Sequence, residues 1–163
     1  MEPTAAEADQ TAEIMRLQAS KPRRAIMLAM IALLGAFIVG LGFRMSTDQF
    51  ALKALFVVMG IAIFATLPSL SRASARSLVV TQDGLLDDRG QMLAAATNIS
   101  GVERGAFAFK PSNGFAIRLH TPAGRAWVPG LWWAQGRRIG VGGLIPAGPA
   151  KAAAEILASM AKE

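Results

Sequence analysis

The chain contains no cysteine and only one histidine, His120. Without thiols it can form neither disulfide bonds nor thiolate nucleophiles, and zinc sites that depend on sulfur ligands are excluded. A single histidine also excludes metal sites in which one chain supplies several imidazoles. The lack of cysteine leaves the redox compartment open.

Charged residues are also scarce, at 17% of the chain, whereas 53% of its residues are hydrophobic and the mean hydropathy is +0.39. The excess lies between residues 25 and 70. Residues 25–43 carry no charge, and residues 50–70 carry only Lys53, close enough to one end for its ammonium to reach the interface. Each run is about as long as a helix needs to be to cross a hydrocarbon core of roughly 30 Å. The two runs and the short turn between them predict a transmembrane helical hairpin over residues 25–70.

Basic residues before the first run are also compatible with a secretory signal peptide. The long charged extension before the run and the second apolar run directly after it favour the hairpin. Orientation follows from the flanking charges, since positive residues collect on the cytoplasmic side. The basic residues at one end of the hairpin are Lys21, Arg23, Arg24, Arg72 and Arg76, and those at the other end are Arg44 and Lys53. We therefore expect a multi-pass protein of the cytoplasmic (inner) membrane with both termini in the cytoplasm.

Small residues recur along the first run at helical spacing: Ala25, Ala29, Ala32, Ala36 and Gly40. Such a face lets two helix backbones approach closely in lipid. It predicts packing either against the second helix of the same hairpin or against a transmembrane helix of another protein. Neither run contains Asp, Glu or His, which argues against a proton or ion path formed by this chain alone.

The segment of residues 1–24 that precedes the hairpin is expected in the cytoplasm. Residues 5–20 are rich in Ala, Glu and Gln, which is typical of a short helix that ends before Pro22. A frayed polar tail fits the same composition.

From residue 71 onward the pattern changes to alternation, as in Phe115, Ile117 and Leu119, the signature of a strand with one buried face. Asn113 and Gly114 favour a hairpin turn that joins this strand to one containing Phe107 and Phe109. Short runs bounded by turn-forming residues, at 78–81, 91–94, 125–128 and 137–141, predict further short strands. The density of turns favours a small antiparallel barrel or two packed sheets, and residues 149–162 have the pattern of a closing amphipathic helix. We expect residues 71–163 to form one cytoplasmic domain, self-contained from about Arg72.

Two short motifs carry a resemblance to a known family. The run Val80-Thr81-Gln82-Asp83-Gly84-Leu85 and the later run Asn98-Ile99-Ser100-Gly101-Val102-Glu103 resemble the opening of bacterial membrane-anchored pleckstrin-homology-like (PH-like) domain proteins. In these, a Thr-x-x-Gly strand precedes an Ile-x-x-Val strand, often after a two-helix membrane hairpin. The resemblance covers residues 77–162. It implies a seven-stranded, partly open barrel capped by a C-terminal helix, with a binding or scaffolding role and no catalytic residues.

Other motifs give little indication of chemistry. Gly140 to Gly143 match neither a dinucleotide fingerprint nor a phosphate loop, because Ile145 and Pro149 occupy essential positions, so no cofactor is expected. Asp87 and Asp88 suit a turn. Trp132 and Trp133, followed by Arg137 and Arg138, are the candidate interaction residues. Adjacent tryptophans cannot share one strand face, so these four residues predict an exposed loop near a bilayer or a partner. The alternative is that one tryptophan is buried and the other packs on the last helix.

The sequence therefore predicts a membrane α-helical hairpin joined to a mainly β, PH-like small barrel with a C-terminal capping helix. The expected function is a non-enzymatic interaction or scaffold protein, such as an accessory subunit or assembly factor of a larger membrane complex. Eleven Lys or Arg face six Asp or Glu from Arg72 onward, so an alternative is a module that binds anionic membrane lipids. A membrane enzyme is a weaker third hypothesis. The expected partners are lipids and another membrane protein or complex, and not nucleic acid.

Overall fold

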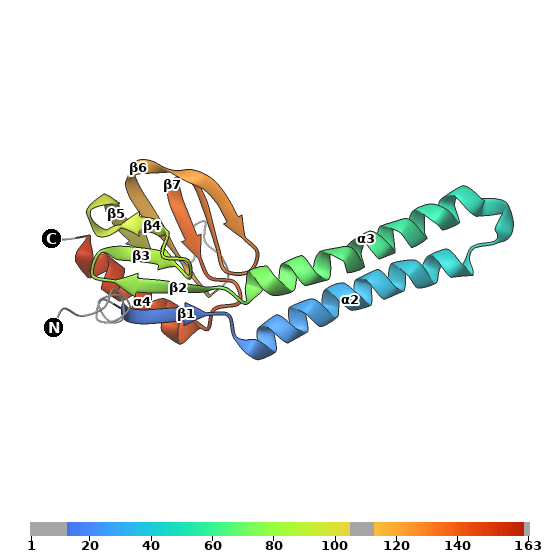
Figure 1. Cartoon of the computed structure of the whole chain (residues 1–163), viewed down its shortest axis with the longest axis horizontal. Helices are drawn as coiled ribbons and strands as arrows, with labels where there is room; N and C mark the ends of the chain where they lie inside the picture. The colour runs from blue at the N-terminus through green and yellow to red at the C-terminus, as the bar shows by residue number, and fades with distance from the viewer. Residues whose placement is uncertain (1–12, 105–112, 162–163) are drawn as a thin grey trace, which may run out of the picture. The chain divides into compact units, whose positions relative to one another are not determined.

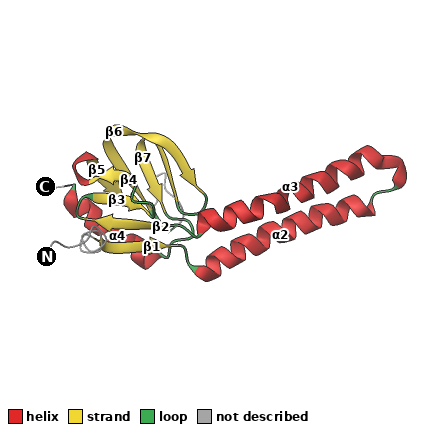
Figure 2. Ribbon diagram, viewed as in Figure 1, coloured by secondary structure: helices red, strands yellow, loops and turns green. Residues whose placement is uncertain are grey.

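The structure is a computed structural model that describes residues 13–104 and 113–161. The chain divides into two compact units, one formed by residues 21–73 and the other by the residues on both sides of that segment. Long helices make up the first unit and strands dominate the second (Figure 2). The hairpin is therefore inserted in the sequence of the second unit, and we describe the two units separately.

Two antiparallel helices form the first unit: α2 (Lys21–Arg44) and α3 (Phe50–Ser74), joined through the short 3-10 helix η1 (Thr47–Gln49). Both predicted helices are confirmed, and each extends by a few residues beyond its apolar run. Both are long and apolar enough to cross a membrane. Their outer side chains, such as Leu33 and Phe37, are about two-thirds exposed, at 65% and 64%, which suits a lipid environment better than water.

Glycine sets the distance between α2 and α3. Gly35 and Gly42 are buried in α2, and Gly60 is buried in α3. A Cβ on Gly60 would overlap a methyl group of Val39 and would lie 2.9 Å from the carbonyl oxygen of Gly35. Near the other end, Nη2 of Arg24 donates to both the carbonyl and the hydroxyl oxygen of Ser71, each at 2.9 Å. The two helices are thus held together by close backbone approach along their length and by the hydrogen bonds between Arg24 and Ser71 at the base of the hairpin.

The second unit begins with β1 (Glu13–Gln18), which corrects the prediction of a helix over this part of residues 1–24. Met15 and Leu17 alternate inward with outward Arg16 and Gln18, and Leu17 is fully buried. Arg16 hydrogen-bonds both carboxylate oxygens of Glu13, which lowers the pKa of that carboxyl below its usual value. Pairing with β2 outweighs the helical composition here, because only a strand can bury Leu17 while satisfying its backbone in the sheet. Residues 1–12 lie outside the described residues.

Two antiparallel sheets follow, with strand orders β1-β2-β3-β4 and β5-β6-β7 (Figure 1). The first contains β2 (Ser77–Thr81), β3 (Gly84–Asp87) and β4 (Met92–Ala95), and the second contains β5 (Ile99–Glu103), β6 (Phe115–Val128) and β7 (Trp132–Val141). The 3-10 helix η2 (Ala96–Asn98) joins them. The predicted strands at 78–81 and 91–94 are confirmed, whereas β3 was not predicted. The two sheets do not close into one barrel among the described residues.

The pairing of β1 with β2 spans the inserted hairpin. Gln18 pairs with Ser77, and Leu17 pairs with Leu78. Only residues 19–20 separate β1 from α2, and only residues 75–76 separate α3 from β2. Because β1 contributes Leu17 to the core from the far side of the hairpin, the β unit includes residues on both sides of it, and the expected domain of residues 71–163 lacks this strand.

Strand β6 is one bent strand where the sequence predicted two strands and a turn at residues 122–124. The register shifts from Arg118↔Arg138 to Ala123↔Gly136, so residues of β6 bulge out of the ladder there. Pro122 has no N–H for the ladder and Gly136 has a φ of +58°, which together permit a sharp bend without breaking the strand pair. Asn113, before β6, has a φ of +57°, as expected for its turn, whereas Phe107 and Phe109 lie outside the described residues.

Helix α4 (Ala147–Met160) closes the second unit, as the apolar stripe predicted, and begins two residues earlier. Ala153 and Leu157 are fully buried and the helix contacts strands of both sheets. Gly142 and Gly143 have positive φ angles and lead from β7 into α4. The core shared by sheets and helix contains Leu17, Leu78, Val80, Leu85, Phe115, Ile117, Ile139, Ile145 and Leu157.

Candidate functional site

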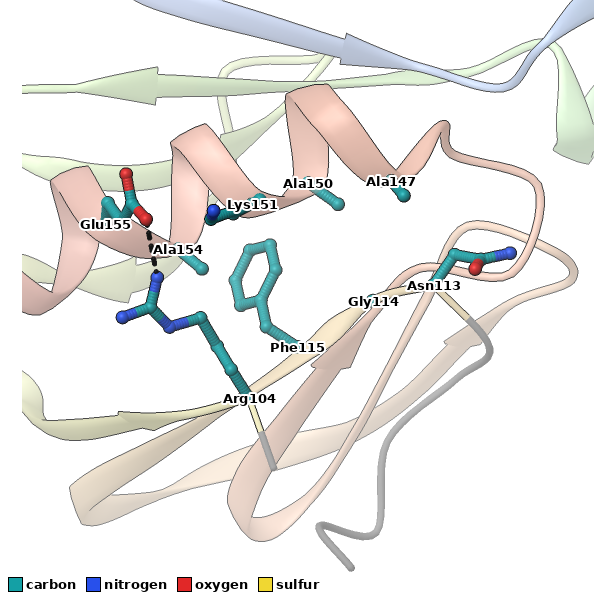
Figure 3. Close-up of a pocket in the computed structure, with 9 residues that line it drawn as sticks. All are labelled: Arg104, Asn113, Gly114, Phe115, Ala147, Ala150, Lys151, Ala154 and Glu155. Carbon is teal, nitrogen blue, oxygen red and sulfur yellow. Dashed lines mark hydrogen bonds and ion pairs between the residues drawn. The ribbon is translucent and has the colours of Figure 1, made fainter. Parts of the chain in front are cut away.

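A groove of about 500 Å³ lies between α4 and the strands β5 and β6 (Figure 3). One wall is formed by Ala147, Ala150 and Ala154, which recur on one face of α4. Their short side chains leave space above the β layer that larger residues would fill. Phe115, at the start of β6, turns its ring toward α4 and is only 1% exposed, so it forms an apolar floor.

Charged groups lie at the rim of this groove. Arg104 Nη1 donates to Glu155 Oε1 at 2.9 Å, and both side chains are about half exposed, at 44% and 54%. Such a pair contributes little to stability, because water screens both charges. Lys151 adds an exposed ammonium on the same helix. An apolar floor with a charged rim is the usual make-up of a binding surface for a peptide or protein segment.

Among the described residues that line the groove, the one carboxylate is Glu155, which is paired with Arg104, and none is Ser, Thr, Cys or His. Within the described ranges, no three His, Cys, Asp or Glu side chains are grouped as a metal site. His120 is exposed on β6. The chemistry that these side chains offer is binding through apolar contact and charge.

Asp87 and Asp88, the adjacent carboxylates, belong to a turn. Asp87 is 3% exposed and its Oδ1 accepts hydrogen bonds from the backbone N–H groups of Arg89 and Gln91, each at 2.9 Å. Its Oδ2 lies 2.6 Å from Nη2 of Arg76, and Asp88 Oδ1 lies 2.9 Å from Nε of the same arginine. The predicted turn role is confirmed, and the arginine that follows α3 is fixed to this turn.

The four predicted interaction residues lie on a strand, which corrects the expected exposed loop. Trp132, Trp133, Arg137 and Arg138 all belong to β7. Trp132 is 6% exposed and its indole Nε1 has no hydrogen-bond partner among the described residues. Trp133 points to the opposite face, as the sequence predicted for adjacent tryptophans, and a Cβ on Gly140 would overlap its indole. Both arginines are exposed. These residues form a strand instead of a loop because Trp132 fills the core and the backbone of β7 forms hydrogen bonds with β6.

The exposed tryptophan is one that the sequence analysis missed. Trp127, on β6, is 73% exposed and pairs directly with Trp133 on β7. Part of the signal was present in the sequence: residues 125–128 were predicted as a strand, in which Trp127 directly precedes the buried Val128. Its register against β7 could not be known from the sequence, so the two tryptophans could not be placed side by side.

The small residues of α2 do not form its contact with α3. Ala25, Ala29, Ala36 and Gly40 are exposed and Ala32 is half-buried. A Cβ on Gly40 would meet nothing within 4 Å, whereas one on Gly35 would meet Ile63 and Phe64 at 3.2 Å. At about 100° per residue, the small stripe lies about a third of a turn away from the face that carries Gly35 and Gly42. The stripe is therefore a second face of α2, separate from the interface within the hairpin.

No family model, curated protein or solved structure matches this chain.

Proposed function

We propose that this chain is a non-enzymatic, membrane-anchored interaction or scaffold protein of the bacterial cytoplasmic membrane. The helices α2 and α3 span the bilayer, and the β unit is held at the cytoplasmic surface, where its groove binds a segment of another membrane protein or complex. An accessory subunit or assembly factor has this organisation.

The observation that carries the proposal is the pairing of β1 with β2 around the inserted hairpin. Gln18 and Ser77 are opposite each other in one antiparallel strand pair, although α2 and α3 lie between them in sequence. Strands in one ladder must lie on the same side of a membrane, so the chain has to cross and return. Cleavage of a signal peptide after the first helix would also remove Leu17 from the core. Both points favour a multi-pass anchor over a secreted protein.

The excess of basic residues at the base of the hairpin favours the cytoplasm as the side that holds the β unit. Linkers of two residues, 19–20 and 75–76, then keep this unit close to the bilayer surface. Two short covalent connections restrict the orientation of the unit far more than a single flexible tether would. A surface held in this way is suited to contacting a neighbouring protein in the same membrane.

The arrangement of the β unit supports a PH-like interpretation. Four strands, β1 to β4, precede three, β5 to β7, in two antiparallel sheets that α4 contacts from the C-terminal end of the chain. The resemblance at residues 77–162 implies seven strands and a capping helix; among the described residues, six strands and α4 lie in that range, and β1 supplies a seventh from before the hairpin. We therefore propose that the unit is a partly open PH-like barrel.

The proposal can be tested by photo-crosslinking of the full chain in its membrane. A photoreactive amino acid at Lys151, on the rim of the groove, should yield a crosslink to one discrete protein. The same amino acid at Gln82, exposed on the β2–β3 turn and outside the groove, is the matched control. Labelling of the same proteins from both positions, or of none from Lys151, would contradict a docking role for the groove.

An alternative function is recognition of anionic lipid headgroups. Between Glu103 and Glu155 the sequence has seven Lys or Arg and no Asp or Glu, so this part of the β unit carries an uninterrupted positive charge. Crosslinks from Lys151 to lipid alone would favour this alternative over a protein partner.

A further inference from the structure

The outer face at the end of the β6–β7 ribbon carries two tryptophans and an arginine. Trp127 and Arg125 lie on β6, opposite Trp133 and Gln135 on β7, and together they line a shallow hollow of about 470 Å³. We call these four residues the tryptophan face. Trp127 is the most exposed large hydrophobic side chain among the described residues, at 73%. Nothing in the fold of the β unit requires an indole to stand in water there.

The position of this face in the β unit indicates what it meets. The β6–β7 turn contains Gly130, whose carbonyl oxygen accepts a hydrogen bond from Leu144 N at 2.9 Å. The carbonyl oxygen of Leu144 in turn accepts from Ser20 N, also at 2.9 Å. Ser20 is the last residue before α2. Two consecutive hydrogen bonds therefore fix the end of the ribbon beside the point where the chain enters the first apolar helix.

Chain length limits how far the tryptophan face can lie from the β6–β7 turn. Trp127 precedes Gly130 by three residues, about 10 Å along a strand. The charged start of α2, from Lys21 to Arg24, occupies the headgroup region if the apolar run from Ala25 onward fills the hydrocarbon core. Tryptophan prefers this level of a membrane, since its ring is apolar and its N–H is polar.

The charge of the ribbon complements an anionic surface. The sequence of β6 and β7 contains four arginines and no acidic residue. Arg118 is engaged by Glu103 at 3.0 Å and pairs with Arg138 in the part of the ribbon away from the turn. Arg125 is the arginine that shares the tryptophan face, two residues from Trp127.

We propose that the tryptophan face is a second membrane contact of this protein, with Trp127 inserted at the bilayer interface and Arg125 bound to anionic lipid headgroups. The occupant is the lipid surface in which the protein's own hairpin is anchored, so the inference rests on the proposed membrane anchor. The contact adds a third attachment to the two linkers and fixes the rotation of the β unit about them.

Intrinsic tryptophan fluorescence tests the contact in the full chain reconstituted into lipid nanodiscs. Brominated lipids quench indoles that touch the bilayer. We expect several-fold stronger quenching in the wild-type chain than in Trp127→Phe, because Trp132 is buried and Trp133 is half-buried. Adding Gln82→Trp to the Trp127→Phe chain moves an exposed indole to the opposite end of β2, where quenching should stay low.

A second control separates this inference from the membrane anchor. Phe37→Trp in the Trp127→Phe chain places an indole on the exposed face of α2, which brominated lipid should quench strongly. Quenching at position 37 without quenching at Trp127 would leave the anchor intact and overturn the contact, with a protein partner as the remaining occupant of the face. Lack of quenching at position 37 would refute the anchor itself and the contact with it.

The proposed binding of Arg125 to anionic headgroups is tested by comparing an anionic with a neutral lipid. Quenching of Trp127 should be stronger in nanodiscs of phosphatidylglycerol than in nanodiscs of phosphatidylcholine, and added salt should reduce the difference. Arg125→Gln should remove most of that difference, whereas Arg89→Gln, at an exposed turn of the other sheet, should leave it unchanged. Equal quenching in both lipids would overturn the assignment of Arg125 to anionic headgroups.

Discussion

Gly35 of α2 and Gly60 of α3 face each other so closely that a Cβ on Gly60 would lie 2.9 Å from the carbonyl oxygen of Gly35. Any larger residue at position 60 would have to push the two helices apart. We therefore expect Gly60→Leu to destabilise the hairpin by about 1–3 kcal/mol, the usual cost of overpacking. Gly40→Leu, which points into open space, should change stability little. Unfolding of both variants in mixed micelles measures the difference, and equal stability would mean that the helices do not pack through Gly60.

The inserted hairpin should be removable if β1 stays joined to β2. Because Gln18 pairs with Ser77, a two-residue Asn-Gly turn can connect them directly in place of residues 19–76. We expect this shortened chain to be soluble and to unfold cooperatively on heating, as followed by circular dichroism. A fragment of residues 72–163 lacks β1 and should fail to show such a transition. Cooperative unfolding of that fragment would show that β1 is dispensable.

The last helix should be essential for the β unit. Leu157 is fully buried against the sheets, so Leu157→Asp places an unpaired charge in the core and should cost about 3 kcal/mol or more. Ser159→Asp adds the same charge at an exposed position of α4 and should cost far less. Urea unfolding of the shortened chain measures both. A similar midpoint for the two variants would show that α4 does not cap the core.

The two adjacent aspartates should differ sharply in importance. Asp87 is buried and accepts two backbone N–H groups as well as a hydrogen bond from Arg76. Asp87→Ala leaves these donors without their acceptor, at an expected cost of about 2–3 kcal/mol. Asp88→Ala loses only a partly exposed contact with Arg76, so we expect at most about 1 kcal/mol. Unfolding of both variants of the full chain in mixed micelles provides the comparison, because the shortened chain lacks Arg76, and the reverse order would contradict the turn geometry.

The orientation in the membrane can be measured with reporter fusions. A reporter that is active only outside the cytoplasm should be silent after Glu163 and active when inserted in the turn between α2 and α3, at residues 45–49. The expectation follows from the basic residues at the base of the hairpin. Activity after Glu163 would reverse the orientation and remove the argument for anionic lipids of the inner leaflet.

The sequence predicted the elements whose pattern is local. An uncharged run such as residues 25–43, the alternation of Phe115, Ile117 and Leu119, and the spacing of Ala153 and Leu157 each indicate an element without knowledge of the rest of the chain. These elements are present. Strand β3 was missed because residues 84–87 show no alternation of apolar and polar residues, and their identity as a strand comes from pairing on both sides with β2 and β4.

Non-local features were beyond the reach of the sequence. The few residues of β1 become a strand only because β2, on the far side of the hairpin, offers Leu78 and Val80 as neighbours. Trp132 was expected in a loop because its burial depends on how β7 folds against β6. The tryptophan face likewise depends on register, since Trp127 and Trp133 are neighbours only in the folded ribbon.

The separation of β1 from β2 by residues 19–76 also determines when the first sheet can form during synthesis. During synthesis β1 emerges first and has no sheet to join until both helices and β2 have been made. If one helix alone crossed the bilayer, β1 and β2 would lie on opposite sides of the membrane. Leu17 could then not pair with Leu78. Under the proposed membrane anchor, assembly of the sheet would therefore depend on insertion of both helices, because β1 and β2 meet only when the chain has crossed the membrane and returned.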